Sequence, residues 1–188
     1  MSPYAQCNNN PVNRIDPDGN WSGKVHKKMI QTAVAQLNEN GMNIDKKQEK
    51  AMIRGSRQAD SFLRGNQSVK RSEIHNMLNP KISVEEAKDN AQKYVEKNME
   101  KFEQTGNYKY LGRAAHTKMD ETCPVHTDQN TGEPLKNDLG LNPKKWIEHI
   151  KGDKANTEQI NKGAEQVKIV IKEGLGKNNP NQEQKGTD

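Results

Sequence analysis

Residues 111–126 read LGRAAHTKMDETCPVH and combine a helix-forming segment with two histidines and an aspartate. His116 and Asp120 are four residues apart, so a helix places them on the same face. There they present a ring nitrogen and a carboxylate oxygen side by side, as metal ligands do. Pro124 ends such a helix and lets His126 turn toward a different metal ion. This segment therefore predicts a helix that carries part of a metal site.

The other histidines occur in comparable patterns. They lie in His149-x3-Asp153, in Trp21-x4-His26 and in Asp60-x14-His75. A single His-x3-Asp pair is more often a surface salt bridge, but this chain has two such pairs, and all five of its histidines can be placed in one scheme. Facing helices that carry inward-pointing ligands are how helical bundles hold metal ions. We therefore expect the imidazoles and carboxylates to converge in a metal cluster.

The rest of the chain predicts an all-α fold. Apolar residues at three- and four-residue spacing and end signals such as Asn40-Gly41 and Ser83-x-x-Glu86 define the helices. The expected helices run from about Lys24 to Asn40, Asp45 to Leu63, Ser83 to Phe102, Tyr108 to Glu121, Pro143 through Trp146 and His149, and Thr157 to Glu173. Residues 64–82 and 127–142 are expected to be loops, and no strand pattern competes.

Composition limits the core and the class of partner. Only 30% of the residues are hydrophobic, whereas globular domains contain roughly 45–50% apolar residues when glycine is included. Bound metal would compensate for a thin core, because its binding energy adds to folding. The net charge of +5 favours polyanions, although a solvated surface of mixed charge is the simpler explanation. Two cysteines cannot form a disulfide framework, and neither a signal peptide nor an apolar run of roughly 20 residues is visible.

Residues 1–20 are rich in turn-forming sequences such as Asn-Pro, Asp-Pro and Asp-Gly. Pro11, Asp16, Pro17 and Gly19 match Pro-x4-Asp-Pro-x-Gly, and the segment resembles the end of the core of bacterial RHS-repeat proteins. Those proteins are large shells that carry a variable toxin after this motif. The resemblance implies a toxin that is secreted or injected within its parent RHS shell, and a cognate immunity protein as partner. An ordinary Asn- and Pro-rich leader is the alternative.

The spaced ligands from Trp21 to Asp153 resemble those of the zinc-dependent phospholipase C and single-strand-specific nuclease superfamily, and residues 111–126 are similar to its central motif. Members are all-α phosphodiesterases with three zinc ions, so the resemblance implies a compact multi-helix bundle with a trinuclear zinc site in its core. Carried over by position, one zinc takes Asp60, His75, His116 and Asp120; a second takes His126, His149 and Asp153; a third takes His26, Asp120 as a bridge, and the amine and carbonyl of Trp21. Asp60 is also the candidate catalytic residue, able to orient or deprotonate the attacking water.

The third site requires Trp21 to be an N-terminal residue. RHS cores are cut just past their Asp-Pro-x-Gly motif, so a cut between Asn20 and Trp21 would create that terminus. We therefore expect residues 1–20 to be the irregular end of an RHS core and residues 21–173 to form the zinc phosphodiesterase domain. Residues 174–188 are polar and are expected to be a disordered tail. Trp21 as a packed aromatic after a turn is the simpler alternative.

The resemblance allows two classes of substrate, nucleic acid and phospholipid. The short Trp21-x4-His26 spacing, the fifteen residues from Asp60 to His75 and an aspartate at Asp153 resemble the nuclease branch. A basic chain with only two Phe and two Trp also has little to insert into a bilayer. Single-stranded DNA or RNA is therefore the favoured substrate, and membrane phospholipid is the alternative. A zinc-stabilised module without activity, for binding or pore formation, is a further alternative.

Overall fold

The computed structural model describes residues 23–61, 64–66, 68–124, 126–137 and 155–177. The described elements are α2 (Gly23–Glu39), α3 (Lys46–Ala59), η3 (Val69–His75, a 3-10 helix), α4 (Val84–Thr105), α5 (Lys109–Asp120) and α7 (Thr157–Lys177). The predicted all-α class is confirmed: the described ranges contain helices and only isolated β-bridges, Leu78 with Lys136 and Thr127 with Pro134. Across these same ranges, the helices are too short or too polar to cross a membrane.

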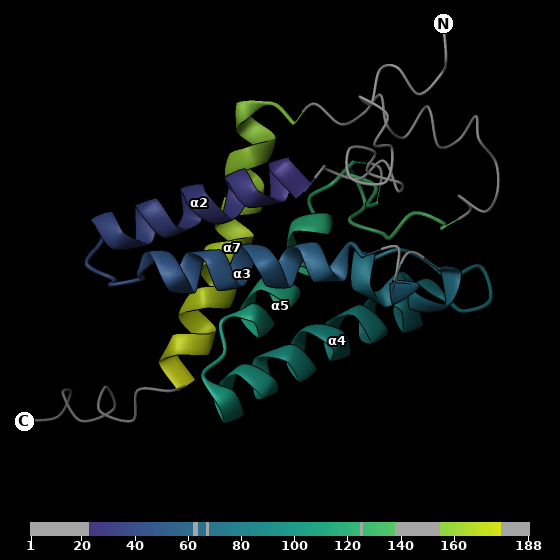
Figure 1. The fold of residues 1–188 in the computed structure, drawn as a ribbon. Helices are drawn as coiled ribbons and strands as arrows, with labels where there is room; N and C mark the ends of the chain where they lie inside the picture. The colour runs from purple at the N-terminus through teal and green to yellow at the C-terminus, as the bar shows by residue number, and fades with distance from the viewer. Residues whose placement is uncertain (1–22, 62–63, 67, 125, 138–154, 178–188) are drawn as a thin grey trace, which may run out of the picture.

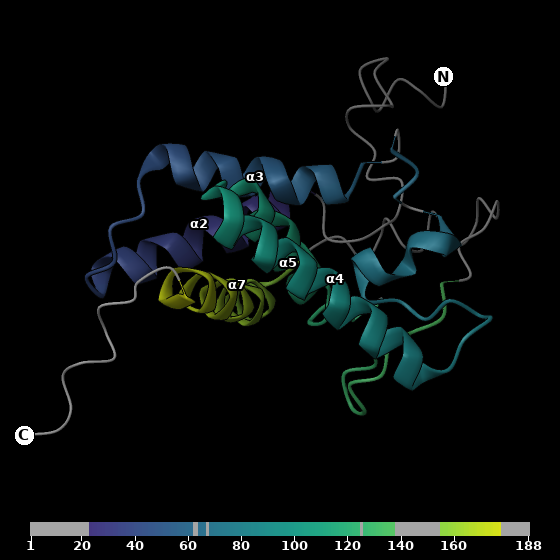
Figure 2. The same ribbon diagram turned by 90° about the horizontal axis from the view of Figure 1, so that it is seen from below.

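Helix α5 lies at the centre of the bundle. It contacts α3, α4 and α7, while α2 packs on α3 and α7 (Figures 1 and 2). Apolar faces of these helices form one core that includes Met29, Leu37, Met52, Phe102 and Leu111. The predicted helical spacing of the α2 segment is confirmed, because five of its six predicted apolar residues are buried and Val25 is half-buried. The core therefore surrounds the helix that carries His116 and Asp120.

Two glycines let α3 and α5 approach until their backbones touch. A Cβ atom added at Gly55 would lie 1.9 Å from the carbonyl oxygen of Lys109, and one added at Gly112 would lie 1.9 Å from that of Met52. No side chain can occupy either space. This close crossing sets the C-terminal end of α3, where Asp60 lies, beside the histidine face of α5.

The helix ends follow local signals in the sequence. Asp45 caps α3 by accepting hydrogen bonds from the backbone of Lys47 and Gln48, and the Gln48 side chain accepts one from the Asp45 amide. Ser83 caps α4 as predicted, accepting from the Glu86 amide at 3.1 Å. Gly106 ends α4 in the left-handed conformation, with φ of 61°, which glycine adopts without a steric penalty.

Three predicted boundaries are wrong. Helix α3 ends at Ala59 rather than Leu63, since the amide of Ser61 bonds to the carbonyl of Gln58, three residues back, and so leaves the α-helical pattern. The expected loop 64–82 contains η3, a segment too short to show periodicity. Helix α7 continues past Glu173 to Lys177, so the predicted tail cannot begin at residue 174. Gly174 is buried against Leu111 and Phe102, and this packing outweighs the low helix propensity of glycine.

Several predictions fall outside the described residues. They concern the irregular leader 1–20, the Asn20–Trp21 junction, the helix expected from Pro143 and residues 178–188. The predicted ligands Trp21, His149 and Asp153 belong to the same group. These stay predictions from the sequence.

Candidate metal centre

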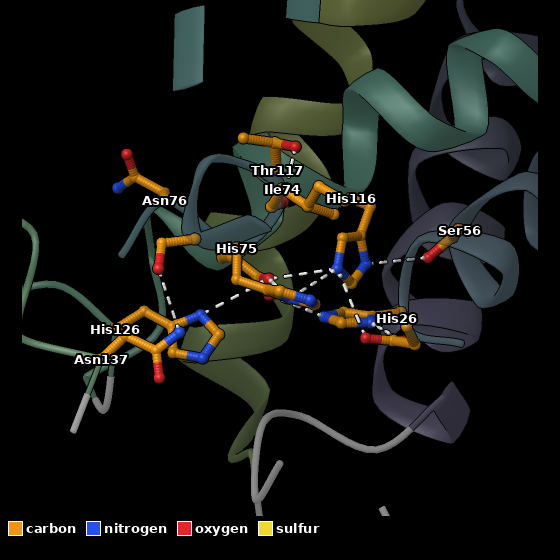
Figure 3. A network of polar contacts seen from close by, with 12 residues as sticks. His26, Ser56, Ile74, His75, Asn76, His116, Thr117, His126 and Asn137 are labelled. Atoms are coloured by element: carbon orange, nitrogen blue, oxygen red, sulfur yellow. Dashed lines mark hydrogen bonds and ion pairs between the residues drawn. The ribbon is translucent and has the colours of Figure 1, made fainter. Parts of the chain in front are cut away.

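Six of the nine predicted ligands are described, and all six meet in one place. Their side chains come from four elements and one connecting segment: His26 from α2, Asp60 from the end of α3, His75 from the last residue of η3, His116 and Asp120 from α5, and His126 from the segment after α5. Figure 3 labels the four histidines, which lie together. The four histidines and Asp120 are at most 2% exposed. We call these six residues the His/Asp cluster.

Three atoms of the cluster form a nearly equilateral triangle. Nδ1 of His75 lies 3.1 Å from Oδ2 of Asp120 and 3.1 Å from Nε2 of His116, and the third side, from His116 to Asp120, is 3.2 Å. Oδ1 of Asp60 lies a further 3.3 Å from the His116 nitrogen. Ligands about 2.0–2.1 Å from a tetrahedral zinc ion are separated by about 3.3 Å. The spacing therefore matches the edges of a zinc coordination shell.

Hydrogen bonds alone cannot satisfy these contacts. Nε2 of His116 carries at most one hydrogen, yet it faces His75, Asp60 and Asp120 at 3.1 to 3.3 Å. One hydrogen can point at only one of these three atoms. A cation between them would interact favourably with all the lone pairs at once. The donor set thus fits a metal ion better than it fits a network of hydrogen bonds.

His26 links the two carboxylates on the other side of the cluster. Its Nδ1 lies 3.2 Å from Oδ2 of Asp60, and its Nε2 lies 3.1 Å from Oδ1 of Asp120. Burial alone would lower the pKa of His26, but the two carboxylates raise it to about 10. In the metal-free protein His26 is therefore an imidazolium. A metal ion that takes a nitrogen of His26 as a ligand must displace a proton.

The carboxylates are ionised at neutral pH. Burial would raise the pKa of both carboxylates, but His116 and the neighbouring imidazoles lower it. The pKa of Asp60 lies below its ordinary value, and the pKa of Asp120 lies well below it. Burial lowers the pKa of His126, which keeps its imidazole neutral and able to bind a metal. Neutral imidazoles and charged carboxylates are the protonation states that metal coordination requires.

A shell of polar contacts orients the cluster. Oγ of Ser56 lies 3.4 Å from Nδ1 of His116 and can accept a hydrogen bond from an Nδ1–H group, which leaves the Nε2 lone pair for a metal ion. The Thr117 hydroxyl donates to the carbonyl of Ile74 at 2.7 Å and ties α5 to η3. Asn76 donates to Thr127 at 3.1 Å, which ties the residue after His75 to the residue after His126. The ligands are therefore held on elements that are bonded to one another (Figure 3).

The structure brings together all the ligands expected for the first zinc ion: Asp60, His75, His116 and Asp120. It also places His26 beside Asp120, as the third site requires, while Trp21 lies outside the described residues. For the second site only His126 is described, with Nδ1 3.4 Å from Asp120. Asp60 differs from expectation, because it contacts His26 as well as His116 and so spans two groups of ligands.

Among the described residues, two groups of three atoms are compact enough to hold an ion. They are His26, Asp60 and His116, and His75, His116 and Asp120, with the ligand atoms of each group within 4.8 Å of one another. The cluster can therefore hold metal.

Two supporting contacts were missed from the sequence. Ser56 precedes Asp60 by four residues on α3, and that spacing could have indicated that both face α5. Arg113 donates to Oε1 of Gln58 at 2.8 Å and bridges α5 to α3.

No family model, curated protein or solved structure matches this chain in the three comparisons made. Function is therefore inferred from the side chains of the cluster and from the sequence patterns that led to them.

Proposed function

We propose that this chain is a zinc-dependent hydrolase of phosphodiesters. The observation that carries the proposal is the triangle of His75 Nδ1, His116 Nε2 and Asp120 Oδ2, with sides of 3.1 to 3.2 Å and Asp60 beside it. Atoms at this spacing, buried and with too few hydrogens to satisfy one another, are suited to share a divalent cation.

The donor types favour a catalytic rather than a purely structural site. Structural zinc sites are commonly closed by four thiolate or imidazole ligands, whereas catalytic sites leave a position for water or substrate. Here the ligands are imidazoles and carboxylates. Zinc held by them would supply a Lewis acid that polarises a phosphoryl oxygen and lowers the pKa of water.

Within the cluster, Asp60 is the ligand most accessible to solvent. Its side chain is 15% exposed, while the Asp120 side chain is fully buried. The lowered pKa of Asp60 keeps it a carboxylate at neutral pH, so it can accept a hydrogen bond from an attacking water and orient it. Asp120 serves to hold the ligand set together, because both its oxygens contact imidazoles. Ser56 fixes the His116 ring.

The sequence before the bundle supports a delivery context for this activity. The RHS-like motif Pro11–Gly19 leads us to propose a toxin released from a larger shell by a cut between Asn20 and Trp21. Release would convert the Trp21 amide nitrogen, a poor ligand, into an amine that completes a third zinc site. In the producing cell, an immunity protein would cover the cluster.

Hydrolysis of bis(p-nitrophenyl) phosphate by the purified chain tests the proposal, because this small diester needs no particular binding surface. We expect hydrolysis with zinc, loss with a chelator and recovery when zinc is restored. Asp120→Asn should abolish it, while Asp89→Asn, at an exposed position on α4, is the matched control. Absence of hydrolysis by a zinc-loaded, folded chain would favour a zinc-stabilised module without activity.

A further inference from the structure

A strongly basic groove of about 780 Å³ lies between the C-terminal end of α3, η3, α4 and α5. Seven lysines and arginines line it but only one carboxylate, Glu73. This excess of six positive charges exceeds the net charge of +5 for the whole chain. The lining of this groove is therefore strongly positive, even with Lys93 paired to Asp89 outside it.

Helix α4 supplies a row of lysines along one wall. Lys93, Lys97 and Lys101 are four residues apart, so they lie on one face at intervals of about 6 Å along the helix axis. Lys93 and Lys97 are exposed, and Lys93 pairs with Asp89 at an exposed site. Such pairs stabilise little, so a stronger anion can displace Asp89. Regularly spaced, solvent-facing cations suit a ligand with regularly spaced anions.

The opposite wall contains Arg64, Lys70 and Arg71. Arg71 and Glu73 form a pair at 2.8 Å, which neutralises the one carboxylate in the groove. Tyr94 and four amide side chains make up the remaining lining residues. Proteins that bind a single nucleic-acid strand place aromatic rings and polar groups between cations. The rings stack on bases and the polar groups form hydrogen bonds.

The groove adjoins the His/Asp cluster through two residues. Arg113 lines the groove and lies one helical turn before His116 on α5. Its partner Gln58, also in the lining, lies two residues before Asp60. Helix α5 and the C-terminal end of α3 therefore carry residues of both the groove and the cluster, while none of the six cluster residues is itself part of the groove lining.

We propose that this groove binds single-stranded nucleic acid and presents its backbone to the His/Asp cluster. The inference rests on the proposed function and narrows its substrate to DNA or RNA. A volume of about 780 Å³ is that of a small-molecule pocket, so it holds a few nucleotides of one strand rather than a duplex. A flat membrane cannot enter it, and among the residues that the structure describes, the exposed large hydrophobic residues are only Leu135 and Ile169.

Binding of fluorescein-labelled oligothymidylate, followed by anisotropy as salt is varied, tests the proposal. The groove variant is Lys93→Gln/Lys97→Gln/Lys101→Gln. The matched control is Lys47→Gln/Lys50→Gln/Arg54→Gln, which removes the same charge from an exposed face of α3 outside the groove. Zinc-loaded protein is mixed rapidly, so that binding is read before cleavage, and phosphatidylcholine and phosphatidylserine vesicles serve as a second ligand.

We expect the groove variant to lose at least about tenfold in affinity for the oligonucleotide. The slope of log K against log salt concentration should become less steep by about two, because each of the three lost phosphate contacts contributes roughly 0.7 to it. The control variant should lose clearly less. Equal losses in both variants, or a loss of vesicle binding alone, would overturn the proposal. The rate of hydrolysis of bis(p-nitrophenyl) phosphate separates the two proposals. If the wild-type protein binds the oligonucleotide but does not hydrolyse this diester, the proposal that the groove binds nucleic acid stands and the proposed hydrolase activity is wrong.

Discussion

Nε2 of His116 lies 3.1 Å from Nδ1 of His75, although the two residues are 41 positions apart in the chain and belong to different helices. Two neutral imidazoles can make this contact only if one of the nitrogens carries the hydrogen. Both nitrogens also face Oδ2 of Asp120 at 3.1 and 3.2 Å. A shared cation explains why three donor atoms are held this close inside a core.

The Ser56 hydroxyl should matter for metal affinity although it is not a ligand. Ser56→Ala removes the acceptor at 3.4 Å that orients His116, and loss of such partners typically lowers affinity about 10–100-fold. Competition with a chromogenic zinc chelator measures this. Ser68→Ala is the control, since that exposed serine makes no side-chain capping bond. Equal affinities in both variants would show that Ser56 does not position the ligand.

The crossing of α3 and α5 should tolerate no side chain at its closest point. Gly55→Ala places a methyl group 1.9 Å from the Lys109 carbonyl oxygen, where backbone atoms must move, so we expect a loss of about 3 kcal/mol or more. Gly176→Ala on α7 meets nothing within 4 Å and should be neutral or stabilise by up to roughly 1 kcal/mol. Urea unfolding followed by circular dichroism measures both changes. Similar stabilities for the two variants would contradict the described contact.

The metal-free protein should lose stability as pH rises. The pKa of His26 is raised from 6.5 to about 10 by Asp60 and Asp120, so between these values the folded state holds a proton that the unfolded chain has released. The contribution of His26 to the free energy of unfolding is therefore at its maximum below pH 6.5, and it decreases as the pH rises from 6.5 to about 10.

Zinc should displace the same proton. Titration of the metal-free protein with zinc at pH 8 in a pH-stat is expected to release about one proton from His26, and His26→Gln should reduce the release. No difference between the wild-type protein and this variant would show that His26 is not protonated in the metal-free state.

Release at Trp21 should increase activity. A chain that begins at Trp21 offers a free amine to the third predicted site, whereas the intact chain offers an amide, so we expect faster hydrolysis and one more zinc ion per chain. A chain that begins at Ser22 has a free amine without the tryptophan and serves as the control. Equal rates for the intact chain and the chain beginning at Trp21 would end this hypothesis.

The sequence predicted the helices well because their spacing and caps are local. The shared face of His116 and Asp120 and the cap at Ser83 follow from neighbouring residues alone. The extension of α7 to Lys177 depends on Gly174 packing against Phe102, a contact between distant segments that no local pattern contains. The 3-10 helix that carries His75 is equally invisible, because its seven residues are too few for periodicity.

The candidate site was predictable for a different reason. Histidines are few, so their spacing relative to Asp60, Asp120 and Asp153 could be compared with a known arrangement. The double contact of Asp60 and the role of Ser56 require coordinates, since both depend on how α2 and α5 cross α3. The lysine row on α4 was visible in the sequence, but only the opposing wall of η3 makes it a groove.

The most direct test is anomalous scattering at the zinc absorption edge from crystals of the chain grown with zinc. We expect a peak about 2.0–2.1 Å from His75 Nδ1, His116 Nε2 and a carboxylate oxygen of Asp120, with Asp60 as the fourth ligand. Ordered side chains in the same positions with no zinc peak between them would contradict the metal centre on which the proposed function depends.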